Sequence, residues 1–117
     1  MKVYLAHNFE ARDWLDTKIA HIIRNAGHEV TSNWIYQQSG IPEKDAVQDL
    51  EDIRRSDALI LYAPPFGYKP GKGKYVEFGF ALALGKRCIV IDPDNCIFFK
   101  LSNVRIARDI EEAIKLV

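Results

Sequence analysis

The chain has 117 residues, of which 48% are hydrophobic and 27% are charged. This size and composition predict one domain over residues 1–117 with a hydrophobic core, and they argue against a second domain. Sixteen basic residues balance sixteen acidic residues, so the formal net charge is zero at pH 7. A balanced charge argues against a nucleic acid polymer or an anionic membrane as the partner.

The sequence also lacks the patterns of a membrane segment and of a metal site. No apolar run reaches the roughly 18 residues that a membrane helix needs, and the amino terminus enters a strand-like run at once. Cys88 and Cys96 have neither a paired cysteine spacing nor a nearby cluster of histidines. We therefore expect a cytoplasmic protein with free thiols, no metal and no cofactor.

The first third of the chain predicts two strands around one helix. Residues 3–6 are typical of a strand, and apolar residues then recur at steps of three and four over residues 9–26, which predicts an amphipathic helix. Gly27 ends that helix, and residues 28–31 predict a short second strand. The polar and aromatic loop over residues 32–41 is longer than a tight connection requires, and such loops often line functional sites.

Pro42 stands where a second helix can begin, over residues 43–56. The side chains expected on its inward face are Ala46, Val47, Leu50 and Ile53. Residues 57–62 predict the third strand, and residues 63–74 contain too many glycines and prolines for regular structure.

The rest of the chain continues the alternation of strands and helices. Residues 73–86 are almost wholly apolar or small and predict a crossover helix that leads to a fourth strand over residues 88–91. After a turn, residues 103–106 are strand-like, and residues 107–116 predict a closing helix that begins near Asp109.

This alternation is typical of a parallel sheet covered on both faces. We expect an α/β fold, a flavodoxin-like doubly wound parallel sheet of five strands in the order 2-1-3-4-5 with helices on both faces. The order reverses between strands one and three, and ligands of open α/β sheets bind at such a point. Residues 4–8 should therefore face residues 63–77.

Glu77 is the one carboxylate in the apolar segment over residues 73–86. We place it in the first helical turn at the carboxyl edge of the sheet, where the helix dipole favours an ionised carboxylate by roughly 0.3–1 kcal/mol. That position suits a nucleophile. The alternative is a residue that only stabilises its own helix start or pairs with Lys74.

Asp49 is the acidic residue of the preceding helix that is best placed to reach the sheet edge. At about 100° per residue it lies at the border of the apolar stripe, whereas Asp52 points away from it. The alternative is a boundary carboxylate paired with Arg12 or Arg54.

Glu77 and Asp49 at one site could act as nucleophile and proton donor, which is the pair needed to break a glycosidic bond. Tyr4, in the first strand, could orient Glu77 through a hydrogen bond, or its ring could simply pack in the core.

These residues resemble the nucleoside 2-deoxyribosyltransferase superfamily, which includes deoxynucleoside 5′-monophosphate N-glycosidases. The resemblance runs from residue 2 to about residue 92. The segments that carry it are Val-Tyr-Leu-Ala at 3–6, Gln-Asp-Leu at 48–50, Ser-Asp-Ala-Leu at 56–59, Glu-Phe-Gly-Phe-Ala at 77–81 and Gly-Lys at 85–86.

The resemblance implies a flavodoxin-like fold and a double-displacement mechanism. It implies that Glu77 attacks the anomeric carbon to form a deoxyribosyl ester, that Asp49 helps the base leave and that Tyr4 orients the nucleophile. It also implies a homodimer or a larger homo-oligomer. The aromatic pair Phe98 and Phe99 or the exposed-looking loop around Trp34 could form its contacts, or these residues could equally pack internally.

The sequence departs from the family pattern at two places near the nucleophile. Tyr75 stands where members carry a glycine, so the backbone must approach the sugar differently. Gly71 stands where many transferases carry a base-recognising aspartate, so base preference cannot be transferred.

The loops that hold phosphate in the monophosphate enzymes contain no serine here. Lys69, Lys72 and Lys74 with their glycines could instead cradle a phosphate, or could belong to a solvated loop. Trp34 could stack on a base, a contact worth about 1–3 kcal/mol. The residues expected to bind substrate are His7, Asn8, Gly73, Lys74, Tyr75 and Trp34.

The sequence thus predicts an enzyme that cleaves or transfers the N-glycosidic bond of a 2′-deoxynucleoside or its 5′-monophosphate. The expected partner is a small nucleoside or nucleotide. The alternative is a module of the same fold that binds a nucleotide or a nucleotide-derived signal without catalysis, since fold alone does not determine function.

Overall fold

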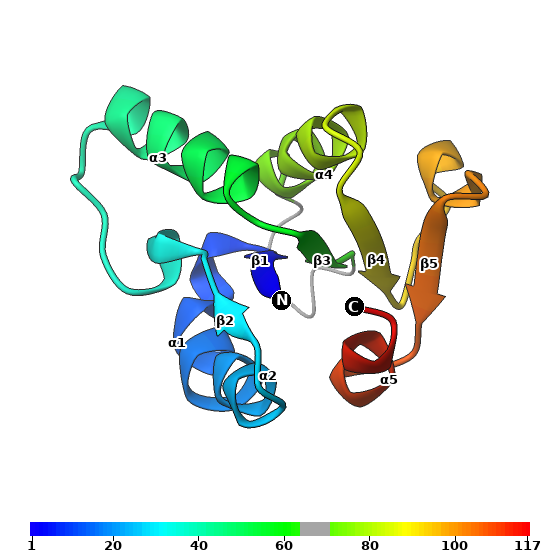
Figure 1. The fold of residues 1–117 in the computed structure, drawn as a ribbon. Coiled ribbons are helices and arrows are strands. Elements are labelled where there is room, and N and C mark those ends of the chain that lie inside the picture. The colour runs from blue at the N-terminus through cyan, green and yellow to red at the C-terminus, as the bar shows by residue number, and fades with distance from the viewer. Residues whose placement is uncertain (64–70) are drawn as a thin grey trace.

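The computed structural model describes residues 1–63 and 71–117, and it shows one parallel five-stranded sheet (Figure 1). The strands follow one another in the order β2-β1-β3-β4-β5, and every neighbouring pair is parallel. Their bounds are β1 Lys2–Ala6, β2 Glu29–Val30, β3 Ala58–Tyr62, β4 Arg87–Ile91 and β5 Val104–Ala107. The predicted fold class and strand order are confirmed.

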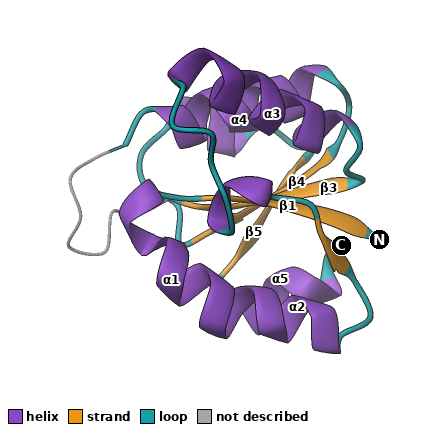
Figure 2. Ribbon diagram, turned by 90° about the vertical axis from the view of Figure 1, so that its left-hand side faces the viewer, coloured by secondary structure: helices purple, strands orange, loops and turns teal. Residues whose placement is uncertain are grey.

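Helices cover both faces of the sheet, as Figure 2 shows. Helices α3 (Pro42–Arg54) and α4 (Gly73–Ala83) lie on one face, and α1 (Arg12–Trp14), α2 (His21–Asn25) and α5 (Ile110–Lys115) lie on the other. The central strand β3 is therefore buried along its whole length. This double cover explains why the strands are continuous apolar runs instead of alternating ones.

The first helical segment is continuous from residue 9 to residue 25 but is not a regular α-helix. It begins with a 3₁₀ turn, and a π-helical stretch, Leu15–Ala20, separates α1 from α2. Four of the buried side chains are spaced four apart, at Ala11, Leu15, Ile19 and Ile23, and Ala20 is also buried. The wider π turn keeps a four-residue spacing on one face. Phe9 and Trp14 belong to the apolar pattern that predicts this helix, but they are 43% and 39% exposed.

The first part of the loop after β2, over residues 31–35, is mostly buried where the sequence suggested exposure, whereas residues 36–41 are exposed. It forms a 3₁₀ turn, Asn33–Ile35, in which Trp34 and Ile35 are each 6% exposed. The turn completes the pairing of β1, because β2 has only two residues. The Leu5 amide donates to Ser32 Oγ at 2.6 Å, and Trp34 Nε1 donates to the Leu5 carbonyl at 3.0 Å. Buried backbone groups require such partners.

Helix α3 is rotated about its axis relative to the expected orientation. Asp52 is fully buried, whereas Val47 is 56% exposed and Ala46 faces a pocket. Ile53 is fully buried, as predicted. The rotation follows from a buried hydrogen-bond acceptor: Asp52 accepts from the backbone and side-chain amides of Asn33.

The carboxyl-terminal region follows the predicted order, with a 3₁₀ turn, Ile97–Lys100, before β5. Asp109 caps α5 by accepting a hydrogen bond from the Glu112 amide at 2.9 Å, which confirms the predicted helix start. Phe99 is buried whereas Phe98 is 57% exposed. Both cysteines are free thiols, and Cys88 is a buried core residue. Among the described helices, none has the length and apolar character needed to cross a bilayer.

Candidate active site

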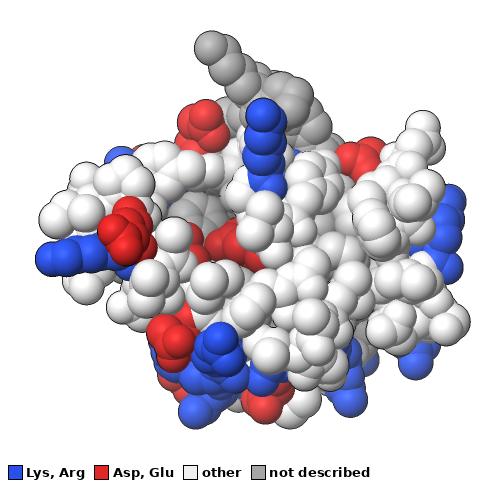
Figure 3. Space-filling view, turned by 90° about the horizontal axis from the view of Figure 1, so that it is seen from above, with Lys and Arg blue, Asp and Glu red and all other residues white. Residues whose placement is uncertain are grey.

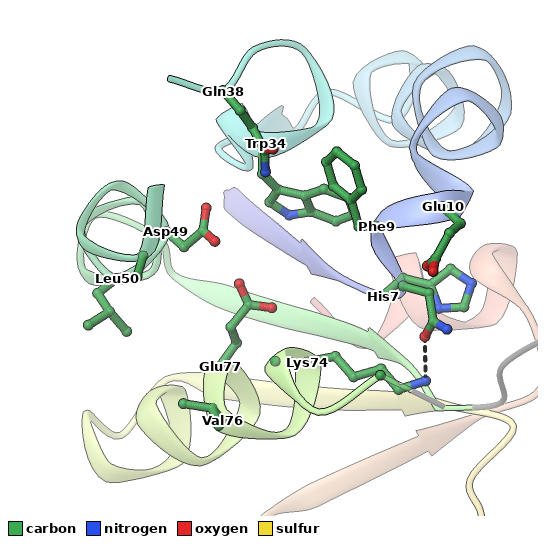
Figure 4. A pocket seen from close by; sticks show the side chains of 14 residues that line it. His7, Phe9, Glu10, Trp34, Gln38, Asp49, Leu50, Lys74, Val76 and Glu77 are labelled. Carbon is green, nitrogen blue, oxygen red and sulfur yellow. Dashed lines mark hydrogen bonds between the residues drawn. The ribbon is translucent and has the colours of Figure 1, made fainter. Parts of the chain in front are cut away.

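A pocket of about 530 Å³ opens at the carboxyl ends of β1 and β3. This is the edge at which the strand order reverses, as the sequence predicts. Its walls come from the segment after β1, from the loop after β2, and from α3 and α4 (Figure 4). Seven of the predicted site residues line it: His7, Asn8, Trp34, Asp49, Gly73, Lys74 and Glu77.

Glu77 lines this pocket and forms a hydrogen bond with Tyr4, which is not among the described residues that line it. The Tyr4 hydroxyl, fully buried in β1, donates to Glu77 Oε2. Burial raises the pKa of the Tyr4 phenol well above its ordinary value, and the nearby carboxylates Glu77 and Asp49 add to this. The phenol therefore keeps its proton and remains a donor to Glu77.

Glu77 lies in the second turn of α4 instead of the first, because the helix begins at Gly73. Burial raises the pKa of Glu77 to about 8; the Tyr4 hydrogen bond lowers it and the charge of Asp49 raises it. The expectation of a carboxylate kept ionised by the helix dipole is therefore wrong for the free protein. Desolvation outweighs a dipole that acts mainly in the first turn.

Asp49 faces Glu77 across the pocket (Figure 4). Burial raises the pKa of Asp49 to about 6, and the charges of Asp52 and Asp45 contribute to this. Its proposed ion-pair partners lie elsewhere: Arg54 pairs with Glu51 at 3.3 Å, and the Arg12 guanidinium lies 4.5 Å from the centre of the Phe9 ring. The pocket therefore contains two carboxyl groups that both bind a proton more tightly than usual.

A buried lysine also lines the pocket. Lys74 is 3% exposed and donates to Asn8 Oδ1 at 2.9 Å and to the Ala63 carbonyl at 2.7 Å. It does not pair with Glu77, and it does not belong to a solvated loop. Burial lowers the pKa of Lys74, while Asp94 opposes this. Because both bonded acceptors are neutral, its positive charge can act on an anion in the pocket.

His7 is held as a neutral imidazole at the end of β1. Burial, followed by the charge of Lys74, lowers the pKa of His7 to about 4. Its Nδ1 lies 3.1 Å from the Tyr62 carbonyl, which can only accept, so Nδ1 carries the proton.

The wall opposite α4 is aromatic. Trp34 lies beside Phe9, with 6.4 Å between ring centres, and Gln38 continues the wall (Figure 4). Phe9, Glu10 and Gln38 line the pocket but were not predicted from the sequence. Phe9 and Glu10 could have been found, because they follow His7 and Asn8 in the segment after β1, at the carboxyl edge of the sheet.

Tyr75, expected to bind substrate, is not among the described residues that line the pocket. Its hydroxyl donates to Asp94 Oδ2 at 2.8 Å, and its ring stacks on Phe99. Gly71 does line the pocket, and a Cβ atom there would lie 3.4 Å from Asn8 Oδ1. Lys72 is exposed, and Lys69 lies outside the described residues.

The charge on this side of the molecule is unevenly distributed. In Figure 3, Asp and Glu side chains lie inside a hollow near the middle of the face, whereas most Lys and Arg side chains lie towards its edges. Among residues 1–63 and 71–117, no three metal-ligating side chains come together.

No family model matches this chain, and no curated protein resembles it closely enough in sequence to be counted as a relative. Solved structures do resemble it. A 2-deoxyribosyltransferase of Bacillus psychrosaccharolyticus superposes with a TM-score of 0.75 at 21% identity, over 97% of this chain and 90% of that one. A CMP N-glycosidase of Clostridium botulinum superposes with a TM-score of 0.67 at 22% identity, over 98% and 96%.

The chain has the fold of these enzymes. A 2-desoxiribosyltransferase of Leishmania mexicana is also similar, with a TM-score of 0.65 and 18% identity over 93% of this chain and 75% of that one. At such identities the likeness establishes the fold, and the activity has to be argued from the side chains of the pocket.

Proposed function

We propose that this protein cleaves or transfers the N-glycosidic bond of a 2′-deoxynucleoside or its 5′-monophosphate. The observation that carries the proposal is the hydrogen bond from buried Tyr4 to part-buried Glu77, whose carboxyl group faces Asp49 across the pocket. Two carboxyl groups on opposite sides of a pocket can attack a sugar carbon and protonate its leaving group. The described structural neighbours, two deoxyribosyltransferases and a CMP N-glycosidase, support this class of reaction.

In the first step, a carboxylate oxygen of Glu77 attacks the anomeric carbon of the sugar. The bond from that carbon to the base nitrogen breaks, and Asp49 gives its proton to the departing base. The product is a deoxyribosyl ester of Glu77 and a free base. In the second step, water or another base attacks the same carbon, releases Glu77 as a carboxylate and returns a proton to Asp49.

The two carboxyl groups hold one proton between them near neutral pH, since the pKa of Asp49 is about 6 and that of Glu77 about 8. Of the two groups, Glu77 has the more strongly raised pKa in the free protein. The reaction needs the same proton on Asp49 and a negative charge on Glu77. A pKa difference of two means that moving the proton from Glu77 to Asp49 costs ~3 kcal/mol. The positive charge that develops on the sugar would offset this cost, because it favours ionised Glu77.

The remaining walls suit the other parts of a nucleoside. Trp34 and Phe9 offer apolar ring surface to a base. Lys74 and the first turn of α4, an 11-residue helix, offer positive charge to a 5′-phosphate. Asn8 and His7 present polar atoms between these two regions.

We keep one alternative, a module that binds a nucleotide in this pocket without catalysis. The observation that favours it is the raised pKa of Glu77, which leaves the nucleophile largely protonated before substrate binds. A homo-oligomer also stays a prediction, supported by the exposed apolar side chains Ile97 and Phe98.

The test is to incubate wild type, Glu77→Ala and Glu51→Gln with deoxynucleosides and their 5′-monophosphates, with and without a second base, and to separate the products by chromatography. Glu51 is an exposed carboxylate on the outer side of α3, so its variant is the matched control. We expect wild type and the control to release or exchange a base, and Glu77→Ala to lose at least 10³-fold in rate. A nucleotide that raises the melting temperature without any base release would favour the binding module.

A further inference from the structure

We propose that Asp52 is a positioning residue of this site, whose buried carboxylate ties the segment that carries Trp34 to the helix that carries Asp49. This inference rests on the proposed function only where it concerns the reaction. Asp52 itself lies outside the pocket and does not contact the space where substrate would bind.

The contacts of Asp52 join two separate segments. Oδ2 accepts from the Asn33 backbone amide at 3.0 Å, and Oδ1 accepts from the Asn33 side-chain amide at 3.1 Å. From α3 and its end, Gln48 Nε2 at 2.9 Å and Arg55 Nε at 3.3 Å donate to the same Oδ1. Four donors from two segments therefore converge on one fully buried carboxylate.

A second set of buried contacts runs parallel to the first. Arg55 Nη2 donates to the Thr31 carbonyl at 2.9 Å, and Ser56 Oγ donates to the Asp52 carbonyl at 2.6 Å. The hydroxyls of Thr31 and Ser56 lie 2.6 Å apart. The loop after β2 is thus bonded to the carboxyl end of α3 over residues 31–33.

Trp34 follows Asn33 directly, so the network sets where its indole lies. The indole nitrogen is bonded to the Leu5 carbonyl of β1, and the backbone before it is bonded to Asp52. Asp49 stands one helical turn before Asp52 on α3. The distance across the pocket from Trp34 to Asp49 is therefore determined by Asp52 and its donors.

The burial of this charge makes the network sensitive to a single change. A buried carboxylate persists only where donors satisfy it, and loss of the acceptor leaves the donors without a partner. An asparagine side chain at this position has the same shape but presents an NH₂ group to groups that are themselves donors. Asp52→Asn should therefore release the Asn33 end of the network while leaving the core side chains unchanged.

The charge of Asp52 also acts on Asp49. The groups that face Asp49 are Asp45 and Asp52 on its own helix, Glu77 on α4 and Tyr4 on β1. After burial, Asp52 is the largest contributor to the raised pKa of Asp49. A neutral residue at position 52 should lower the pKa of Asp49. The rate of base release, measured against pH, should then begin to fall at a lower pH on the acid side.

The first measurement does not need any activity. The chain contains two tryptophans, so Trp14→Phe leaves Trp34 as the single indole fluorophore. In this background, Asp52→Asn is compared with Glu51→Gln, the neighbouring exposed carboxylate on α3. We expect Asp52→Asn to raise the acrylamide quenching constant of Trp34 at least threefold and Glu51→Gln to leave it unchanged. Equal quenching in both variants would overturn the proposal.

The second measurement is the steady-state kinetics of base release. We expect Asp52→Asn to raise KM about tenfold, because a tenfold change corresponds to the loss of one charge-assisted hydrogen bond in the network. We expect kcat to change less than threefold and the low-pH limb of the pH–rate profile to shift to lower pH. If wild type releases no base, the proposed function fails while the fluorescence still decides the role of Asp52. If Asp52→Asn does not fold by circular dichroism, Asn33→Ala, which removes one donor and keeps the carboxylate, decides by the same quenching measurement.

Discussion

Replacing Glu77 by glutamine should make the protein more stable than wild type in alkaline solution and leave its stability nearly unchanged in acid. Glu77 is part-buried, and its pKa rises from an ordinary value of 4.5 to about 8 in the folded protein. Between these two values the folded state holds a proton on Glu77 that the unfolded chain has lost. The stability of wild type must therefore fall as pH rises through this window.

The size of the effect follows from the two pKa values. Their difference of about 3.5 corresponds to ~5 kcal/mol at 1.36 kcal/mol for each pH unit. The carboxyl group borders a pocket that water can enter, so we reduce this by half and expect ~2.5 kcal/mol above pH 8. The introduced glutamine side chain is neutral throughout, and its amide oxygen can still accept the hydrogen bond from Tyr4.

Urea unfolding at intervals from pH 4.5 to pH 9 measures this difference. Asp49 is present in both proteins, so the comparison isolates Glu77 as far as the two groups act independently. Glu51→Gln, at an exposed position, is the control and should follow wild type at every pH. If Glu77→Gln also tracks wild type from pH 4.5 to pH 9, the carboxyl group is not desolvated and the assignment of its proton is wrong.

Two further predictions concern the rate profile and the core. The kcat/KM for base release should rise and then fall with pH, with limbs near pH 6 and pH 8. The reason is that only the singly protonated pair of Asp49 and Glu77 is active. A kcat/KM that does not change from pH 5 to pH 9 would contradict this. Ile53→Ala should lower the free energy of unfolding by about 2–5 kcal/mol, since Ile53 is fully buried between α3 and the sheet. Chemical denaturation measures that loss, and a loss below ~1 kcal/mol would mean that the neighbouring side chains close the cavity.

Much of the fold was predictable because the hydrophobic pattern repeats at the period of each element. The run from Ala58 to Tyr62 is apolar on both faces, as a strand covered on both sides must be. The pairing of Tyr4 with Glu77 was predictable for a related reason, since strand order brings the carboxyl ends of β1 and β3 together.

The position of Trp34 could not be predicted from the loop that contains it. A polar and aromatic segment after a short strand is typical of an exposed loop, and nothing local indicates that β1 needs its hydrogen bonds. The requirement arises because β2 ends after two residues, which leaves the Leu5 carbonyl without a strand partner.

The sequence by itself determined the order of strands and helices, the edge at which a site forms and the residues Tyr4, Asp49 and Glu77 that meet there. The elements follow from the hydrophobic periodicity of neighbouring residues, and the strand order follows from the fixed handedness of the crossover connections. Only the tertiary structure decided that Asp52 is buried and that burial raises the pKa of Glu77 to about 8. Both depend on how much water remains around a carboxyl group, and that is determined by side chains distant in the sequence.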